Sequence, residues 1–151
     1  MKVLFVCTGN TCRSPMAQAL FAEEMKKRGA ACESRSAGIA TFTGSPASDH
    51  AVTVMKEIGI DLSRFRSTSI KAILAEDFDL YVPMTYHHAM ALIEYGIGKH
   101  KIYMFDKDIS DPYGGSIDFY RRTRDELAAQ IKKLADFCEE KLADKGDDSH
   151  D

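Results

Sequence analysis

An apolar run followed directly by a short polar segment is the feature that most constrains the fold of this chain. Residues 3–6 read Val-Leu-Phe-Val, and residues 7–14 read Cys-Thr-Gly-Asn-Thr-Cys-Arg-Ser. A short continuous apolar run is typical of a strand buried in a parallel sheet. Ser14 and Pro15 both suit the first turn of a helix, so residues 7–14 are predicted to connect a strand to a helix. Open α/β sheets bind their ligands at such carboxyl ends of strands.

The connecting segment has the features of a loop that holds an anion. Its backbone N–H groups can close around a tetrahedral anion, Gly9 allows a tight turn, and the following helix directs its positive end to the same place. We therefore predict a phosphate-binding loop after the first strand. The residues expected to surround a bound phosphate or similar oxyanion are Thr8, Gly9, Asn10, Thr11, Cys12 and Ser14.

Two residues distinguish this loop from a nucleotide-binding loop, which would place Lys and then Ser or Thr after its last glycine. Arg13 offers two parallel donors to phosphoryl oxygens, and its positive field stabilises a thiolate at Cys7. Ser14 can donate a hydrogen bond to the same sulfur. We predict that Arg13 binds the phosphoryl group and that Cys7 attacks it. The alternative is that Cys7 is an ordinary buried cysteine.

A group expelled by a thiolate needs a proton, so a carboxylic acid is expected on a second loop. The segment at residues 106–116 contains a proline and a glycine pair and is predicted to be that loop. Asp106, Asp108 and Asp111 are the candidates. Asp111 is favoured because the proline behind it stiffens the chain, and Tyr113 could then line the cleft.

The motifs together closely resemble those of the low-molecular-weight protein tyrosine phosphatase family. Cys7, five residues, and then Arg-Ser-Pro stand near the N-terminus, and Asp111 followed by proline stands near the C-terminus. The resemblance covers residues 2 to about 142. It implies that phosphate is transferred to Cys7 as a phosphocysteine, and that Asp111 protonates the leaving group.

The resemblance also implies how the loop is supported. A Ser-Ala-Gly stretch lies beside the catalytic loop in the family, and the matching Ser36 would help to hold Asn10. Many family members have a His near Phe65 and an Arg near Thr68, and both are replaced in this chain.

Length and composition indicate a single α/β domain. The chain has 151 residues, of which 44% are hydrophobic, enough for one core with two sides. Strands that alternate with helices favour a parallel twisted sheet with helices on both faces. Four strands are predicted, at residues 3–6, 31–37, 78–82 and 101–105. The resemblance adds the strand order 2-1-3-4.

Charge divides the chain into two parts. Residues 144–151 contain four aspartates and one lysine, so this end holds the whole formal net charge of −3. We predict a phosphatase-like domain at residues 1–143 and an acidic disordered tail at residues 144–151. The rest of the chain is neutral overall, and nothing in it indicates the basic face that a nucleic-acid partner would require.

Several further classes are excluded by composition. The four cysteines and five histidines are scattered without metal-ligand spacing, so we expect neither a metal site nor a cofactor. No apolar stretch is as long as a membrane span, and the N-terminal residues do not have a signal-peptide pattern. We therefore expect a cytoplasmic enzyme with no membrane partner and with reduced cysteines.

The identity of Thr11 bears on the substrate. This position is usually aliphatic in the tyrosine phosphatases, whereas the sequence from Thr8 to Ala17 and the Asp-Pro-aromatic-Gly-Gly-Ser-Ile-Asp motif resemble the protein arginine phosphatase branch. A hydroxyl can accept a hydrogen bond from a guanidinium, which an aliphatic side chain would leave unpaired. Protein phosphoarginine is the favoured substrate, and phosphotyrosine is the alternative.

Two other functions remain as alternatives, together with one form of regulation. An arsenate reductase would share the loop but needs two more reactive cysteines in the middle of the chain, and residues 79–95 contain none. A phosphopeptide-binding protein without activity would not need an acid opposite a thiol. The paired cysteines of the family imply a redox-sensitive thiol, through a reversible disulfide between Cys7 and Cys12.

Overall fold

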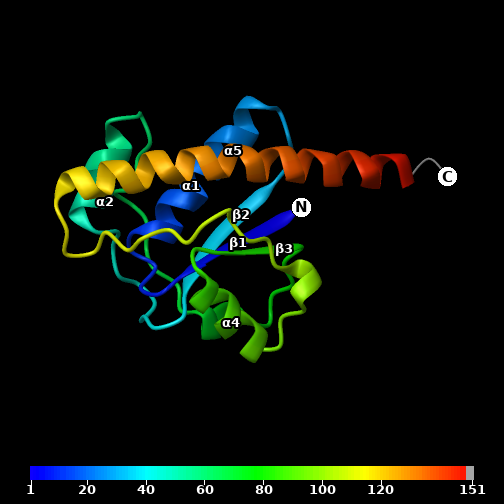
Figure 1. The fold of residues 1–151 in the computed structure, drawn as a ribbon, viewed down its shortest axis with the longest axis horizontal. Helices are drawn as coiled ribbons and strands as arrows, with labels where there is room; N and C mark the ends of the chain where they lie inside the picture. Colours follow the sequence, from blue (N-terminus) through cyan, green and yellow to red (C-terminus); the bar gives the residue numbers. More distant parts are fainter. Residues whose placement is uncertain (149–151) are drawn as a thin grey trace.

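The computed structural model describes residues 1–148 (Figure 1). A strand, the predicted loop and a helix follow one another at the N-terminus, and the helix begins at Arg13 with Ser14 and Pro15 in its first turn. The elements in chain order are β1 (Lys2–Cys7), α1 (Arg13–Lys27), β2 (Glu33–Gly38), α2 (Asp49–Lys56), α3 (Ile70–Ile73), β3 (Leu80–Pro83), α4 (Tyr86–Glu94), a 3₁₀ helix (Lys99–Lys101) and α5 (Ile117–Asp148).

Three parallel strands form the sheet, in the order β2-β1-β3. Cys7 at the end of β1 pairs with Gly38 at the end of β2, and Val6 pairs with Pro83 at the end of β3. The central strand β1 is apolar and buried along nearly its whole length, as expected for a strand covered on both faces. The carboxyl ends of all three strands therefore lie together, and the predicted anion loop leaves the sheet at this end.

The fourth strand predicted at residues 101–105 is wrong, because the sheet formed within residues 1–148 has three strands. The segment still lies beside β3. The N–H of Tyr103 donates to the carbonyl of Tyr81 at 2.9 Å, and Ile102 forms an isolated parallel bridge with the same residue.

The reason for the missing strand lies in β3. The N–H of Met84 donates to the carbonyl of Val6 in β1, so the backbone nitrogen of the preceding residue, Pro83, faces the opposite side. A proline has no N–H to donate there, and pairing cannot continue past one residue. The 3₁₀ helix at Lys99–Lys101 also takes up the start of the predicted strand.

Helices cover both faces of the sheet, as predicted (Figure 1). On one face, Val3 and Phe5 of β1 pack against apolar side chains of α1, α2 and α5. On the other face, Leu4 and Val6 pack against residues of α3 and α4. The alternation of side chains along β1 thus supplies both halves of the core.

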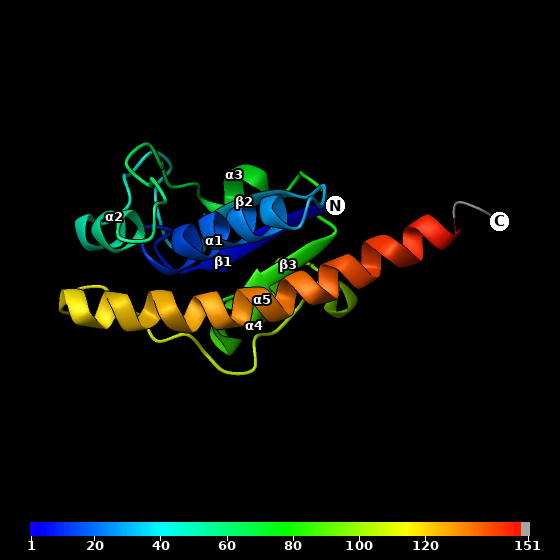
Figure 2. The same ribbon diagram turned by 90° about the horizontal axis from the view of Figure 1, so that it is seen from above.

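The last helix is longer than the sequence indicates. α5 continues past the boundary predicted at residue 143, so residues 144–148 of the predicted tail are helical, and residues 149–151 lie outside the described residues. Figure 2 shows these last turns extending beyond the sheet. Good helix formers precede them, and Lys145 Nζ lies 3.7 Å from Asp79 Oδ1, which ties the extension to the body of the protein.

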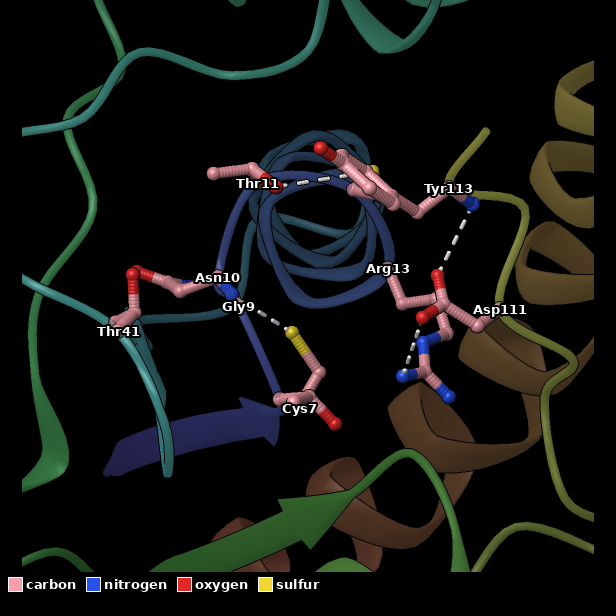
Figure 3. Close-up of a pocket in the computed structure, with 10 residues that line it drawn as sticks. Cys7, Gly9, Asn10, Thr11, Arg13, Thr41, Asp111 and Tyr113 are labelled. Carbon is pink, nitrogen blue, oxygen red and sulfur yellow. Dashed lines mark hydrogen bonds and ion pairs between the residues drawn. The ribbon is translucent and has the colours of Figure 1, made fainter. Parts of the chain in front are cut away.

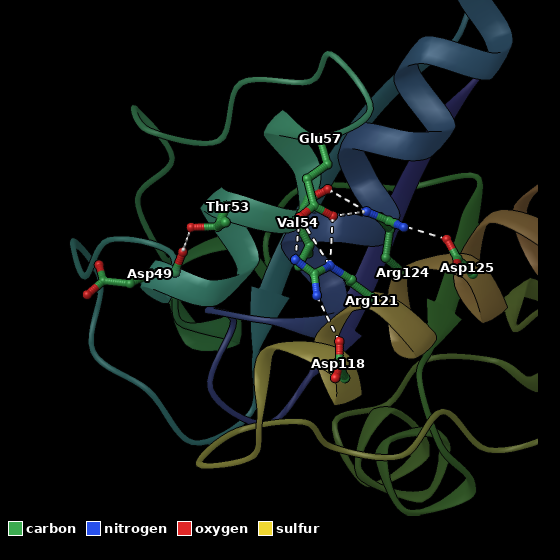
Figure 4. A network of polar contacts seen from close by, with 8 residues as sticks. All are labelled: Asp49, Thr53, Val54, Glu57, Asp118, Arg121, Arg124 and Asp125. Atoms are coloured by element: carbon green, nitrogen blue, oxygen red, sulfur yellow. Dashed lines mark hydrogen bonds and ion pairs between the residues drawn. The ribbon is translucent and has the colours of Figure 1, made fainter.

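Ion pairs fasten α2 to α5 (Figure 4). Glu57, directly after α2, lies 2.8 Å from Arg121 Nη2 and 2.8 Å from Arg124 Nη1. The hydrogen bond from Arg121, together with that from Arg124, lowers the pKa of Glu57 to about 2, so this carboxylate is ionised at neutral pH. Arg124 also donates to the carbonyl of Val54 at 2.9 Å. The first turns of α5, which follow the segment 106–116, are thereby held against α2.

Candidate active site

A cavity of about 320 Å³ opens at the carboxyl end of β1. It is lined by residues 7–13, by Thr41 from the connection between β2 and α2, and by Asp111 and Tyr113 from the segment before α5. In Figure 3 the sulfur of Cys7 points into this cavity, and Asp111 and Thr41 lie on opposite sides of it. The structure therefore brings together the two separate segments in which sequence analysis placed the site.

Most of the residues predicted to surround a phosphoryl group line this cavity. Those that line it are Thr8, Gly9, Asn10, Thr11, Cys12 and Tyr113. Ser14 is the exception, because it is fully buried behind the loop and contacts the site through the sulfur of Cys7.

The loop turns at Asn10 rather than at the predicted glycine. Asn10 has a φ of 55°, in the left-handed region that Asn tolerates better than most residues. Gly9 does not occupy that region, and a Cβ on it would meet only Thr11 Oγ1, at 3.7 Å. The glycine that the loop does require is Gly38 at the end of β2, where a Cβ would come within 2.6 Å of the carbonyl oxygen of Thr8.

A chain of hydrogen bonds leads from the backbone to the sulfur of Cys7. The N–H of Thr68 donates to Asn10 Oδ1 at 2.8 Å, and Asn10 Nδ2 donates to Ser14 Oγ at 2.8 Å. Ser14 Oγ lies 2.8 Å from Cys7 Sγ, and the hydroxyl is the donor when the sulfur is a thiolate, which has no proton of its own. The backbone N–H of Asn10 is a second donor to the sulfur, at 3.2 Å. Two donors on one sulfur are what a thiolate requires.

The support for Asn10 differs from the one that the family resemblance implied. Ser36 does not hold Asn10, because its hydroxyl donates instead to Gln18 Oε1 at 2.6 Å. The backbone N–H of Thr68 holds it, which needs no particular side chain at that position. Phe65, where the family has a nearby His, packs against the apolar cluster. In this chain, Asn10 is therefore held by a backbone donor.

Burial and hydrogen bonding act on the Cys7 thiol in opposite directions. Burial raises its pKa, and the side chain is 2% exposed. The Ser14 hydroxyl, the backbone of Ser14, the charge of Arg13 and the backbone N–H of Asn10 lower the pKa, in that order. Because burial has the larger effect on this pKa, formation of the thiolate depends on each of these stabilising groups.

Replacing Ser14 with Ala should raise the pKa of the Cys7 thiol further. The variant loses the strongest of the donors to sulfur, so at a pH below the thiol pKa we expect iodoacetamide to alkylate Cys7 about tenfold more slowly. Mass spectrometry over a series of pH values measures this rate. Ser36→Ala is the matched control, since that hydroxyl donates to Gln18. An unchanged pH profile in Ser14→Ala would contradict the role of the hydroxyl.

Arg13 is 5% exposed and is held from the segment before α5. Its Nη1 donates to the carbonyl of Ile109 at 2.9 Å, and its Nη2 lies 3.5 Å from Asp111 Oδ2. Asp111 is half exposed, and its other oxygen accepts the N–H of Tyr113 at 3.1 Å. The guanidinium is thus fixed on one side by the backbone, with its remaining N–H groups available to an anion.

The three candidate acids differ in where they lie relative to the cavity. Asp111, the candidate favoured from the sequence, lines the cavity. Asp106 forms an ion pair with Lys133 of α5, and Asp108 accepts the N–H of Tyr86 at the start of α4, at 2.9 Å. Of the three carboxylates, Asp111 is therefore the one placed to meet a group bound over Cys7.

The residues that hold the loop from outside were not predicted from the sequence. Thr68 and Ile109 act through their backbone, so their side chains give no signal. Gly38 acts by having no side chain, and a glycine at the end of a predicted strand is the one signal that could have identified it. Thr41 lines the cavity from a connection that the sequence marks only as a loop.

The second cysteine of the loop has its own partners. Cys12 Sγ lies 3.3 Å from the Tyr120 hydroxyl and 3.4 Å from Ser48 Oγ. All four cysteines, which lie within the described residues, are free. Within residues 1–148, no three His, Cys, Asp or Glu side chains gather as a metal site would require, and no helix combines the length and apolarity needed to cross a membrane.

Comparison with known proteins places this chain in a family. A family model described as low molecular weight phosphotyrosine protein phosphatase matches residues 2–147. A curated protein-arginine-phosphatase from Geobacillus stearothermophilus is 41% identical over 143 residues, which cover 89% of this chain and 94% of the relative.

Two solved structures are also similar. A low molecular weight protein tyrosine phosphatase from T. tengcongensis has a TM-score of 0.84 and 40% identity, covering 90% of this chain and 98% of the other. A Cys-to-Ser mutant of the YwlE arginine phosphatase, with a phosphorylated active-site serine, has a TM-score of 0.84 and 35% identity, covering 92% and 96%. With a family model that spans nearly its whole length, this chain belongs to the low molecular weight phosphotyrosine protein phosphatase family.

Proposed function

We propose that this chain is a cytoplasmic protein phosphatase that hydrolyses phosphorylated side chains through a phosphocysteine intermediate, with protein phosphoarginine as its favoured substrate. The observation that best supports this is the shared cavity of Cys7, Arg13 and Asp111. A nucleophile, a cation for the phosphoryl oxygens and an acid for the leaving group are the parts that such a reaction needs.

In the first step the thiolate of Cys7 attacks phosphorus. An S–P bond forms while the bond from phosphorus to the leaving nitrogen or oxygen breaks, and Asp111 gives its proton to that atom. Arg13 and the backbone N–H groups of the loop stabilise the charge on the three remaining phosphoryl oxygens. The leaving group departs neutral, so the step requires no other reagent.

In the second step water attacks the phosphocysteine. Asp111, now a carboxylate, takes a proton from this water, the new P–O bond forms, and the S–P bond breaks to restore the thiolate of Cys7. Inorganic phosphate leaves the loop, and Asp111 is again protonated for the next substrate. The phosphorylated active-site serine in the Cys-to-Ser YwlE mutant supports transfer to the corresponding position in this chain.

Thr11 supports the preference for phosphoarginine. It lines the cavity, and the hydroxyl of Thr is able to accept a hydrogen bond from the guanidinium of a substrate. An aliphatic residue would leave that donor unpaired at a cost of roughly 1–3 kcal/mol. The relative named protein-arginine-phosphatase favours the same substrate, while the similar tyrosine phosphatase structure keeps phosphotyrosine as the second candidate.

Replacing Thr11 with Ile should depress kcat/KM for a phosphoarginine peptide by about 10–100-fold and leave a phosphotyrosine peptide nearly unaffected. The variant removes an acceptor that a guanidinium uses and a phenyl ring does not. Matched peptides that differ only in the phosphorylated residue, assayed by phosphate release, measure the two values side by side.

Thr11→Ser is the control for this experiment, because it keeps the hydroxyl and removes only a methyl group. It should retain most of the phosphoarginine activity. Equal losses on both peptides in Thr11→Ile would remove the case for phosphoarginine and leave a tyrosine phosphatase. A wild-type chain that binds vanadate but releases no phosphate from either peptide would be a binding protein and not an enzyme.

We also propose that the thiol is redox-sensitive. Peroxide would oxidise the thiolate of Cys7 to a sulfenic acid, and the thiol of Cys12 would then displace water to form a disulfide. Mild peroxide treatment followed by peptide mass spectrometry should show the Cys7–Cys12 link, which dithiothreitol reverses. Recovery of Cys7 only as sulfinic acid would contradict this proposal.

A further inference from the structure

The first turn of α4 contacts both segments of the site. His88 Nε2 lies 2.8 Å from the side-chain oxygen of Thr8, the first residue of the loop after Cys7. From the same turn, the N–H of Tyr86 donates to Asp108 Oδ1 at 2.9 Å. Directly before it, the carbonyl of Met84 accepts the N–H of Ile109 at 2.9 Å. One turn of helix thus joins the phosphate loop to the segment that contains Asp111.

His88 is buried, with an exposed fraction of 1%, and both of its ring nitrogens have partners. Nδ1 lies 2.9 Å from Thr85 Oγ1, and that oxygen also accepts the backbone N–H of His88 at 3.3 Å. Thr85 Oγ1 therefore has its proton left to donate to Nδ1. In the tautomer that accepts this proton, the ring carries its own proton on Nε2 and donates to Thr8, so both hydroxyls and both ring nitrogens are hydrogen-bonded.

The surroundings of His88 keep its ring neutral. Burial, followed by the charges of Arg13 and His87, lowers the pKa of His88 to about 4, against the opposing charges of Asp108 and Asp111. A neutral imidazole has one donor and one acceptor, which matches the two hydroxyls on either side of it. The reaction proposed above uses no group of this residue.

We propose that His88 is a positioning residue whose hydrogen bond to Thr8 fixes the phosphate loop relative to the segment that holds Asp111. This inference rests on the proposed function, since it concerns the distance between the nucleophile and the acid of that reaction. Loss of the bond would free the start of the loop from α4, while Tyr86 and Met84 still held residues 108 and 109. The phosphoryl group on Cys7 would then stand less well aligned with Asp111.

Two variants separate positioning from stability, because each keeps one of the two ring contacts. In His88→Gln the amide can reach the place of Nε2 and contact Thr8. In His88→Asn the shorter amide can reach only the place of Nδ1 and contact Thr85. Since each loses one hydrogen bond, their thermal unfolding midpoints should fall by similar amounts.

Activity should differ between the two variants. We expect His88→Asn to lower kcat/KM for phenyl phosphate by about tenfold, and His88→Gln to stay within about twofold of wild type. The loss in His88→Asn should be smaller for para-nitrophenyl phosphate, whose better leaving group depends less on the acid. Thr8→Val should reproduce the loss, and the double variant with His88→Asn should add little to it.

Equal losses in the Asn and Gln variants, or an equal loss on both substrates, would overturn the proposal and leave His88 as a packing residue. Protection of Cys7 from iodoacetamide by inorganic phosphate provides a readout that does not require turnover. If the wild-type chain hydrolyses neither substrate, the proposed function fails. The protection assay then still compares the two variants, and weaker protection in His88→Asn alone would support the positioning of the loop.

Discussion

A Cys7→Ser variant is expected to lose turnover of an aryl phosphate by more than about 10⁴-fold. The serine hydroxyl is a far weaker nucleophile than a thiolate at neutral pH, because almost none of it is ionised. The side chain is nearly isosteric, so the hydrogen bonds from Ser14 and Asn10 and the contacts of Arg13 should remain. The variant should therefore still bind phosphate and vanadate.

The same variant tests the covalent step. With a phosphorylated substrate, slow transfer should leave a phosphoserine at position 7, visible as one added phosphoryl group in the mass of the peptide that contains it. Cys32→Ser is the matched control, since that free cysteine is half buried away from the cavity. A Cys7→Ser protein that kept a tenth of the wild-type turnover would show that another nucleophile acts.

An Asp111→Asn variant should lower kcat by about 10²–10⁴-fold for a substrate with a poor leaving group, and by much less for a good one. The amide keeps the shape of the side chain and its contact with the N–H of Tyr113, but it cannot supply a proton. Steady-state kinetics with phenyl and para-nitrophenyl phosphate measure this difference, and the inhibition constant for vanadate measures anion binding.

Binding of the anion should survive this change, because Arg13 loses a negative neighbour and keeps its contact with Ile109. Asp106→Asn is the control from the same segment, where the carboxylate pairs with Lys133 on the surface of α5. Asp106→Asn should leave kcat and the inhibition constant for vanadate near the wild-type values. Full activity in Asp111→Asn would mean that a different group protonates the leaving atom.

The parts of the site that the sequence predicts are those that local chemistry determines. The strand, loop and helix from residue 3 onward follow from an apolar run, from turn residues and from residues that favour a helix start. These three signals are neighbours in the chain. Cys7 and Arg13 could be assigned roles because both belong to that one loop. Asp111 could be favoured among three aspartates from the proline behind it, and the family resemblance added its role. Its approach to Arg13 at 3.5 Å joins segments almost a hundred residues apart, which no local pattern describes.

The predictions that failed concern contacts between distant segments. Asn10, and not Gly9, adopts the left-handed conformation because its side chain is held by Thr68 and Ser14, which local propensity does not include. The strand at residues 101–105 has the right composition but meets Pro83, whose missing N–H stops the pairing. Secondary-structure propensity describes a segment alone, whereas in both cases a contact with a distant segment determined the backbone conformation.

The covering of both faces was predictable for a different reason, because a buried apolar strand must be covered twice. The order of the three strands was implied by the family resemblance and not by the residues themselves. The length of α5 was not predictable in this way. Its acidic end favours water, and the contact of Lys145 with Asp79 depends on the folded position of β3.

The ion pair between Arg13 and Asp111 has a consequence for the whole catalytic cycle. A guanidinium that is only 5% exposed would be costly without a negative partner, and the half-exposed Asp111 is the carboxyl group beside it. The Asp111 carboxyl group lies 3.5 Å from the guanidinium, and a phosphoryl dianion in the loop would be a second and stronger partner for the same N–H groups. The dianion would draw Arg13 toward itself and leave the carboxyl group free to face the leaving group. Binding of the substrate would thus place the acid as well as the anion.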